Sequence, residues 1–291
     1  MQGVEFTLDT RNGRFAGLAW RRPGAPRMLC LHGWLDNAAS FLPLAPFLDH
    51  WDLVALDFAG HGHSDHRPRG ARYYMTDNLW DLDAVLDALA WDRCHLLGHS
   101  LGGVVATSYA AAEPERVVSL LTLDGLGPLS AAAGETVPRL RRALHSVRKA
   151  SGQLRDYPDP DAAAQARSAA SGLPLDCARL LCSRALKQEE GAYRWRTDPA
   201  LNWHSPSLLS EPQVLEILGA VQAPVLSVTS APMPDWIGPE RVAGRMRAVA
   251  RLTQREITGH HHFHMDQPEP VAEWIRDFLA QPELAHDHAQ A

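Results

Sequence analysis

Short apolar runs alternate with amphipathic segments along most of the chain. Four of these runs have the length and composition of buried strands and span residues 27–31, 53–57, 94–97 and 117–123. Between them, apolar residues recur every three or four positions, which predicts helices over residues 37–48 and 76–89. Strands that alternate with helices indicate a parallel sheet covered on both faces.

The two ends of the chain extend this sheet. Residues 4–8 and 15–20 are strand-like and are joined by the turn pair Asn12-Gly13, which predicts an antiparallel hairpin at a sheet edge. Near the other end we expect strands over residues 223–229 and 252–257 and helices near 239–249 and 270–279. Together these elements predict an α/β fold with a mostly parallel eight-stranded sheet.

Residues 127–222 break the alternation. They are rich in Ala and Arg, helical in composition, and interrupted by a Pro/Asp stretch at 157–161. Such a length is too great for a loop in a compact domain, so we expect a helical cap inserted after the sixth strand. The core then comprises residues 1–126 and 223–282, and residues 283–291 form a frayed tail.

Composition narrows the range of partners. With 291 residues, 45% of them hydrophobic, the chain can bury a large core in one domain plus the insertion. A net charge of -6 gives no sign of a nucleic-acid partner. One basic run is expected to be the solvated face of a helix; it comprises Arg139, Arg141, Arg142, Arg148 and Lys149.

The cysteines and the N-terminal residues bear on localisation. The four cysteines have no metal-ligand spacing, which indicates free, buried thiols in a reducing compartment. The chain begins without a signal-like stretch, and no apolar run approaches the length of a membrane span. We expect a cytoplasmic monomer or homodimer with no membrane partner.

The stretch Gly98-His99-Ser100-Leu101-Gly102-Gly103 is the strongest chemical signal. It lies between a strand-like run and a helix-like segment, the context of a nucleophile elbow. The glycines relieve a turn that strains the serine backbone and leaves no room for Cβ atoms. The alternative is a glycine-rich turn with an incidental serine.

Four blocks in this order resemble the α/β-hydrolase superfamily: residues 32–34, 57–64, 98–103 and 259–268. The amino-acid sequences of residues 32–41 and 124–129 are similar to those of the serine-hydrolase-like branch. The resemblance implies that Ser100 is the nucleophile and that the backbone N–H groups of Trp34 and Leu101 form the oxyanion hole. It also implies structural roles for His32 and for the loop at residues 57–64.

Four candidates for the general base lie in the stretch Gly259-His260-His261-His262-Phe263-His264. In the family frame, the catalytic histidine precedes a proline by seven residues, and Pro268 therefore selects His261, with His260 as the nearest competitor. A metal site at His262, His264 and Asp266 is the rival interpretation. Gln267 stands where that motif needs another histidine, so we expect no metal and no organic cofactor.

Two residues compete for the role of triad acid. Asp124 follows the strand at 117–123, which matches the family's earlier position for this residue. Asp235 lies after the strand that follows the insertion, about two residues later than the family's usual position. We favour Asp124, and either choice preserves the order Ser, Asp, His.

These residues predict a serine hydrolase that acts on a small carboxylic ester or related acyl compound through an acyl-enzyme. The same triad serves carbon–carbon bond hydrolases and perhydrolases, and the fold also hosts non-catalytic ligand-binding proteins. The insertion is expected to roof the pocket, and four aromatic residues are candidates to contact the small-molecule acyl substrate: Trp34, Phe41, Trp203 and Trp236.

Overall fold

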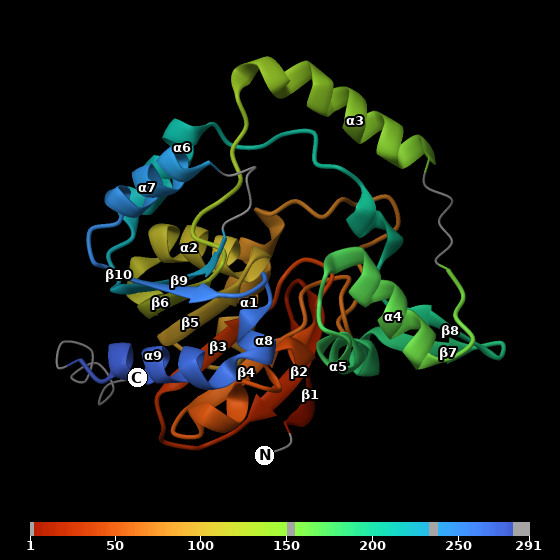
Figure 1. Ribbon diagram of the computed structural model, residues 1–291, viewed down its shortest axis with the longest axis horizontal. Coiled ribbons are helices and arrows are strands. Elements are labelled where there is room, and N and C mark those ends of the chain that lie inside the picture. The colour runs from red at the N-terminus through yellow and green to blue at the C-terminus, as the bar shows by residue number, and fades with distance from the viewer. Residues whose placement is uncertain (1–2, 150–154, 233–237, 282–291) are drawn as a thin grey trace.

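The computed structural model describes residues 3–149, 155–232 and 238–281 (Figure 1). Its central sheet has eight strands in the order β1-β2-β4-β3-β5-β6-β9-β10. These are β1 (Val4–Thr10), β2 (Gly13–Trp20), β3 (Arg27–Leu31), β4 (Asp52–Leu56), β5 (Cys94–His99), β6 (Val117–Leu123), β9 (Val225–Ala231) and β10 (Leu252–Thr258). The β1–β2 and β2–β4 pairs are antiparallel and all other neighbours are parallel, which confirms the predicted mostly parallel sheet.

Helices cover both faces of this sheet (Figure 1). One face packs against α1 (Asp77–Ala88), α2 (Leu101–Ala112) and α6 (Glu211–Ala220), and α7 (Pro239–Ala248) lies beside α6. The other face packs against two 3₁₀ helices and α9 (Pro268–Leu279). Each side buries its own apolar cluster, as the alternation of strands and amphipathic helices predicts.

Residues 37–48 form two short 3₁₀ helices, η1 (Ala38–Phe41) and η2 (Ala45–Leu48), and the prediction of one continuous helix there is wrong. Pro43 and Pro46 lack the backbone N–H that an α-helix interior requires. Their apolar neighbours still face the sheet, so the 3.6-residue periodicity reports burial correctly but not the type of helix.

The insertion contains α3 (Thr136–Lys149), α4 (Pro160–Ser171), α5 (Leu175–Ala185) and the antiparallel pair β7 (Leu186–Glu189) and β8 (Ala192–Trp195). Helices α4 and α5 bury a separate apolar cluster that includes Ala163 and Leu181. Helix α6 also lies within residues 127–222, but its Val214 and Leu218 are buried in the cluster between the sheet and α2. That helix therefore packs as part of the core.

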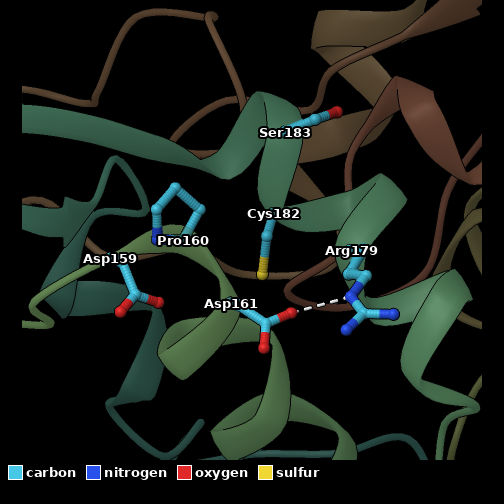
Figure 2. Close-up of a pocket in the computed structure, with 6 residues that line it drawn as sticks. All are labelled: Asp159, Pro160, Asp161, Arg179, Cys182 and Ser183. Carbon is cyan, nitrogen blue, oxygen red and sulfur yellow. Dashed lines mark hydrogen bonds and ion pairs between the residues drawn. The ribbon is translucent and has the colours of Figure 1, made fainter.

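A hollow of about 520 Å³ lies between the start of α4 and α5. Asp161 and Arg179 line it and pair with each other, with Oδ1 and Nε 2.7 Å apart, and the Cys182 side chain also lines it (Figure 2). None of the predicted catalytic residues lines it. All four cysteines are free and buried, as predicted. None of the described helices combines the length and the apolar character needed to cross a bilayer.

The elbow is set into the sheet by very close backbone packing. A Cβ atom added at Gly102, in the first turn of α2, would overlap the carbonyl group of Leu31 in β3. One added at Gly98 would overlap the backbone of Gly102. Because these neighbours are backbone atoms of central elements, they cannot move aside as a side chain could.

We therefore expect Gly102→Ala to lower the free energy of unfolding by about 3 kcal/mol or more, the cost of overpacking against a rigid backbone. Gly134→Ala is the matched control, because a Cβ atom there meets nothing within 4 Å. Urea denaturation followed by circular dichroism measures both variants. Equal midpoints for the two would show that the elbow is not closely packed.

Candidate active site

Ser100 lies between β5 and α2 with φ 51° and ψ -114°. A positive φ is strained for a residue with a Cβ atom and is found where the surrounding structure enforces it. The Ser100 N–H donates to the carbonyl of Leu123 at the end of β6, 2.9 Å away, which fixes the turn to the neighbouring strand. The sequence predicted this strand–turn–helix arrangement from the spacing of its glycines.

Asp124 follows β6 and also has a positive φ, 54°. Its carboxylate accepts hydrogen bonds from the Ser230 backbone N–H (3.0 Å) and the Ser230 hydroxyl (2.8 Å). Burial alone would raise the pKa of Asp124, but the hydrogen bonds from His261 and Ser230 outweigh it and lower the pKa below its ordinary value. The residue is therefore held as a carboxylate whose Oδ2 accepts from His261.

His261 lies in the loop between β10 and α8 (Phe263–Asp266), and its Nδ1 is 2.7 Å from Asp124 Oδ2. Because a carboxylate can only accept, Nδ1 carries the proton and the Nε2 lone pair of a neutral imidazole is left for another partner. The His261 carbonyl accepts from His99 Nε2 at 2.9 Å, and the two rings are 4.7 Å apart. His261 therefore lies against the residue that immediately precedes Ser100.

The structure thus places Ser100, Asp124 and His261 after the ends of β5, β6 and β10, with Asp124 and His261 in contact. His260, the nearest competitor, is turned elsewhere, with its Nε2 3.0 Å from Asp266 Oδ2. The alternative acid Asp235 lies outside the described residues, so its comparison with Asp124 is left to experiment.

Asp36 forms a second acid–histidine contact, with His262, in addition to the contact between Asp124 and His261. The sequence alone did not predict it. Its Oδ2 accepts from His262 Nε2 (3.1 Å), and its Oδ1 accepts from Arg167 Nη2 of α4 (2.6 Å). Burial of Asp36 favours the neutral acid, but His262, His99 and Arg167 outweigh it and keep the pKa of Asp36 well below its ordinary value. This carboxylate joins the insertion to the loop that carries His261.

Among the described residues, Asp36, His99 and His262 form a group of donor atoms close enough to hold a cation, all within 4.8 Å of one another. The carboxylate is already paired with Arg167, which satisfies its charge from the protein itself. The three residues of the rival metal motif do not converge. His262 faces Asp36, His264 Nε2 is 2.7 Å from the Ser40 hydroxyl, and Asp266 faces His260.

The two predicted oxyanion donors come from two separate segments of the chain. Leu101 is the first residue of α2, so its N–H points out of the start of the helix rather than into its hydrogen-bond ladder. Trp34 follows the His32-Gly33 pair after β3, and the loop is fixed by a hydrogen bond from the Leu35 N–H to His61 Nε2 (3.2 Å). Their role as an oxyanion hole stays a prediction.

The four candidate substrate residues have different surroundings. Trp34 is 39% exposed. Trp203 is half-buried in the loop after η5 (Pro199–Asn202), with the Arg72 guanidinium 4.4 Å from its ring. Phe41 is fully buried in the cluster between the sheet, the two 3₁₀ helices and α9. Trp236 lies outside the described residues.

His32 and Asp57 hold loops, as the resemblance implied. His32 Nδ1–H donates to the Gly33 carbonyl (2.7 Å), and its Nε2 accepts from the Phe58 N–H (3.0 Å). Burial lowers the pKa of His32 to about 4, which keeps this bridge neutral. Asp57 accepts from the Ala38 N–H (2.7 Å) and is paired with Arg184 of the insertion.

The sheet order, the serine elbow and the histidine loop define the class of α/β-hydrolase-fold proteins. A family model described as "alpha/beta hydrolase fold" matches residues 26–268, and the chain belongs to this family. It is 31% identical over 290 residues to a serine hydrolase-like protein of Danio rerio, a match that covers 96% of this chain and 89% of the relative. It is 30% identical to serine hydrolase-like protein 2 of Homo sapiens, covering 94% and 93%.

Solved structures agree with this assignment. A hypothetical protein of Pseudomonas aeruginosa PAO1 is 34% identical with a TM-score of 0.88, covering 97% of this chain and 100% of the other. A thioesterase domain from the curacin biosynthetic pathway is 25% identical with a TM-score of 0.82, covering 95% and 100%. The predicted resemblance to the serine-hydrolase-like branch is confirmed.

Buried histidines predict an acid-sensitive fold. Burial lowers the pKa of His32 and His99 to about 4 and that of His61 to about 3, against about 6.5 for an unfolded chain. Between these values the unfolded chain binds protons that the folded chain does not, so stability falls as pH falls from about 6.5 to about 4. Each histidine contributes up to about 3 kcal/mol to this loss.

Urea denaturation at about pH 7.5 and about pH 5 checks this expectation, with proton uptake on unfolding as a second readout. A free energy of unfolding that stays constant between the two would contradict it.

The Asp36 carboxylate predicts a large stability effect. Asp36→Asn leaves the Arg167 guanidinium and His262 around a neutral amide, and we expect a loss of about 3 kcal/mol in the free energy of unfolding. Asp161→Asn is the matched control, because Asp161 also pairs with an arginine at 2.7 Å but on the exposed surface. It should change the urea midpoint little. Similar losses in both variants would show that burial of the Asp36 pair does not matter.

Proposed function

We propose that the protein is a serine hydrolase that cleaves small carboxylic esters or related acyl compounds through Ser100, His261 and Asp124. The observation that carries this proposal is the 2.7 Å hydrogen bond between His261 Nδ1 and Asp124 Oδ2 beside a serine held in an elbow. An elbow with an incidental serine would not require a histidine oriented in this way. Membership of the α/β-hydrolase family supports the same reaction class.

In the proposed reaction, the His261 Nε2 lone pair accepts the Ser100 hydroxyl proton as Oγ attacks the substrate carbonyl carbon. The backbone N–H groups of Leu101 and Trp34 stabilise the oxyanion of the tetrahedral intermediate. Asp124 stabilises the imidazolium, which then protonates the departing alcohol or thiol. Water, activated by the same histidine, releases the acyl group from Ser100 and regenerates the hydroxyl.

Ser230 supports the acid in this proposal. Its N–H donates to Asp124 Oδ1, and its hydroxyl donates to Oδ2, the same oxygen that accepts from His261 Nδ1. Asp124 thus has a fixed orientation and a lowered pKa, the two properties that a triad acid needs. For this reason we propose Asp124 rather than Asp235 as the acid.

The proposed substrates include acyl compounds other than simple esters. The similar thioesterase domain supports the inclusion of thioesters among the substrates to be tested. Carbon–carbon bond hydrolases use the same triad, so a panel of esters, thioesters and β-diketones separates these reactions by their products. A protein that binds but does not cleave the panel would be a ligand-binding member of the fold.

Labelling with a fluorophosphonate, followed by intact mass, tests the proposal. We expect one adduct on the wild type and none on Ser100→Ala. His261→Ala should slow labelling by about a thousandfold, since it removes the base that activates the serine. Asp124→Asn should slow it by a similar order, because the histidine loses its orienting partner.

Matched controls are available within the chain. His260→Ala removes the neighbouring imidazole and Asp235→Asn removes the alternative acid, and each should label at nearly the wild-type rate. Circular dichroism shows that every variant is folded. A wild-type protein that is folded but unlabelled would contradict the proposal. If Asp235→Asn lowers the labelling rate more than Asp124→Asn does, the acid is Asp235.

A further inference from the structure

Helix α3 stands apart from the rest of the molecule and contributes nothing to a core. Figure 1 shows it at the outer edge of the structure, spanning the space between the α6–α7 side and the α4–α5 side. None of its residues is buried. The insertion begins after β6, next to Asp124, so α3 lies in the part of the chain that leaves the sheet beside the candidate active site.

The side of α3 that faces the protein is defined by burial. Arg139, Ala143, Ser146 and Val147 are half-buried and recur every three or four residues, which places them on one side of the helix. The Ser146 hydroxyl accepts from the His204 N–H at 3.0 Å, and this contact holds the helix to the loop after η5. The helix is thus anchored with a fixed side outward.

An apolar stripe runs along the exposed surface of α3. Val137, Leu140 and Leu144 follow one another at helical spacing and are 55%, 45% and 59% exposed. Single exposed apolar residues are common on protein surfaces, but three in a row on one anchored helix form a patch. A solvated basic face, as the sequence alone suggested, does not account for this stripe.

The rest of the helix surface is strongly basic. Arg141 and Arg148 lie next to the stripe, while Arg142 and Lys149 lie farther round the helix. Helix α3 holds no acidic residue in a chain whose net charge is -6. An apolar stripe flanked by cations on a short, polar-rich helix is the pattern of helices that lie in the interface of an anionic bilayer. A planar surface can also reach a helix at the outer edge of the molecule without any groove.

We propose that α3 docks the protein on anionic lipid surfaces, with Val137, Leu140 and Leu144 inserted among the acyl chains and the basic residues against the headgroups. A second copy of this chain is a poorer occupant, because a two-fold interface would bring the two cationic clusters together. None of the observations behind this proposal involves Ser100, so the proposal stands whether or not the proposed hydrolase activity is found.

Co-sedimentation of the full chain with vesicles tests the proposal. We expect binding to phosphatidylcholine vesicles that contain phosphatidylglycerol, little binding to pure phosphatidylcholine, and weakening with salt. Leu140→Ser/Leu144→Ser should reduce the partition coefficient about tenfold or more, since it removes most of the inserted apolar surface. Arg141→Glu/Arg148→Glu should reduce it by a similar factor, because these two cations border the stripe.

Arg247→Glu/Arg255→Glu is the matched control, because it makes the same change in net charge at two exposed arginines in α7 and β10. It should keep binding within about twofold of the wild type. No binding, equal binding to both vesicle types, or equal loss in the control would overturn the proposal. So would self-association that the double leucine variant abolishes, since the stripe would then be covered by a second copy.

Discussion

Backbone packing between β3, β5 and α2 is the constraint on which the candidate site depends. Gly98 and Gly102 allow the end of β5 and the start of α2 to approach so closely that a Cβ atom would overlap main-chain atoms. This approach forces Ser100 into its strained turn, because the chain must reverse within one residue. Ser100 is half-buried, and this geometry fixes its position at the end of β5.

Polar contacts then fix the groups around Ser100. Asp124 is oriented by Ser230, and His261 is held between Asp124 and the His99 side chain. Beneath them, Asp36 accepts from His262, the next residue after His261, and from Arg167 of the insertion. The insertion and the histidine loop are therefore connected through one carboxylate. A shift of α4 would move Arg167 and Asp36 and, through His262, the position of His261.

The sequence predicted the sheet and the elbow well, because both depend on local patterns. Alternating apolar runs define the strands, and the glycine spacing has a steric meaning that needs no knowledge of distant residues. His261 and Asp124 were found through the family frame, and their mutual contact is consistent with it. The roles of these residues in a reaction remain predictions until they are tested.

Other features could not be predicted from the sequence because they depend on residues far apart in the chain. The Asp36 network joins three distant segments, and no spacing rule connects Asp36 with Arg167 or His262. Phe41 is buried against the sheet through its packing with residues far along the chain, and its contact with a substrate stays a prediction. The exposure of α3 likewise depends on what the folded chain leaves uncovered, which composition cannot show.

A crystal structure of the phosphonylated protein is the most direct test of the central claim, that the elbow presents Ser100 to a histidine oriented by Asp124. We expect phosphorus bound to Ser100 Oγ, the phosphoryl oxygen about 3 Å from the N–H groups of Leu101 and Trp34, and His261 Nδ1 still bonded to Asp124. Attachment at another residue, a phosphoryl oxygen directed away from both N–H groups, or His261 paired with Asp235 would contradict the account.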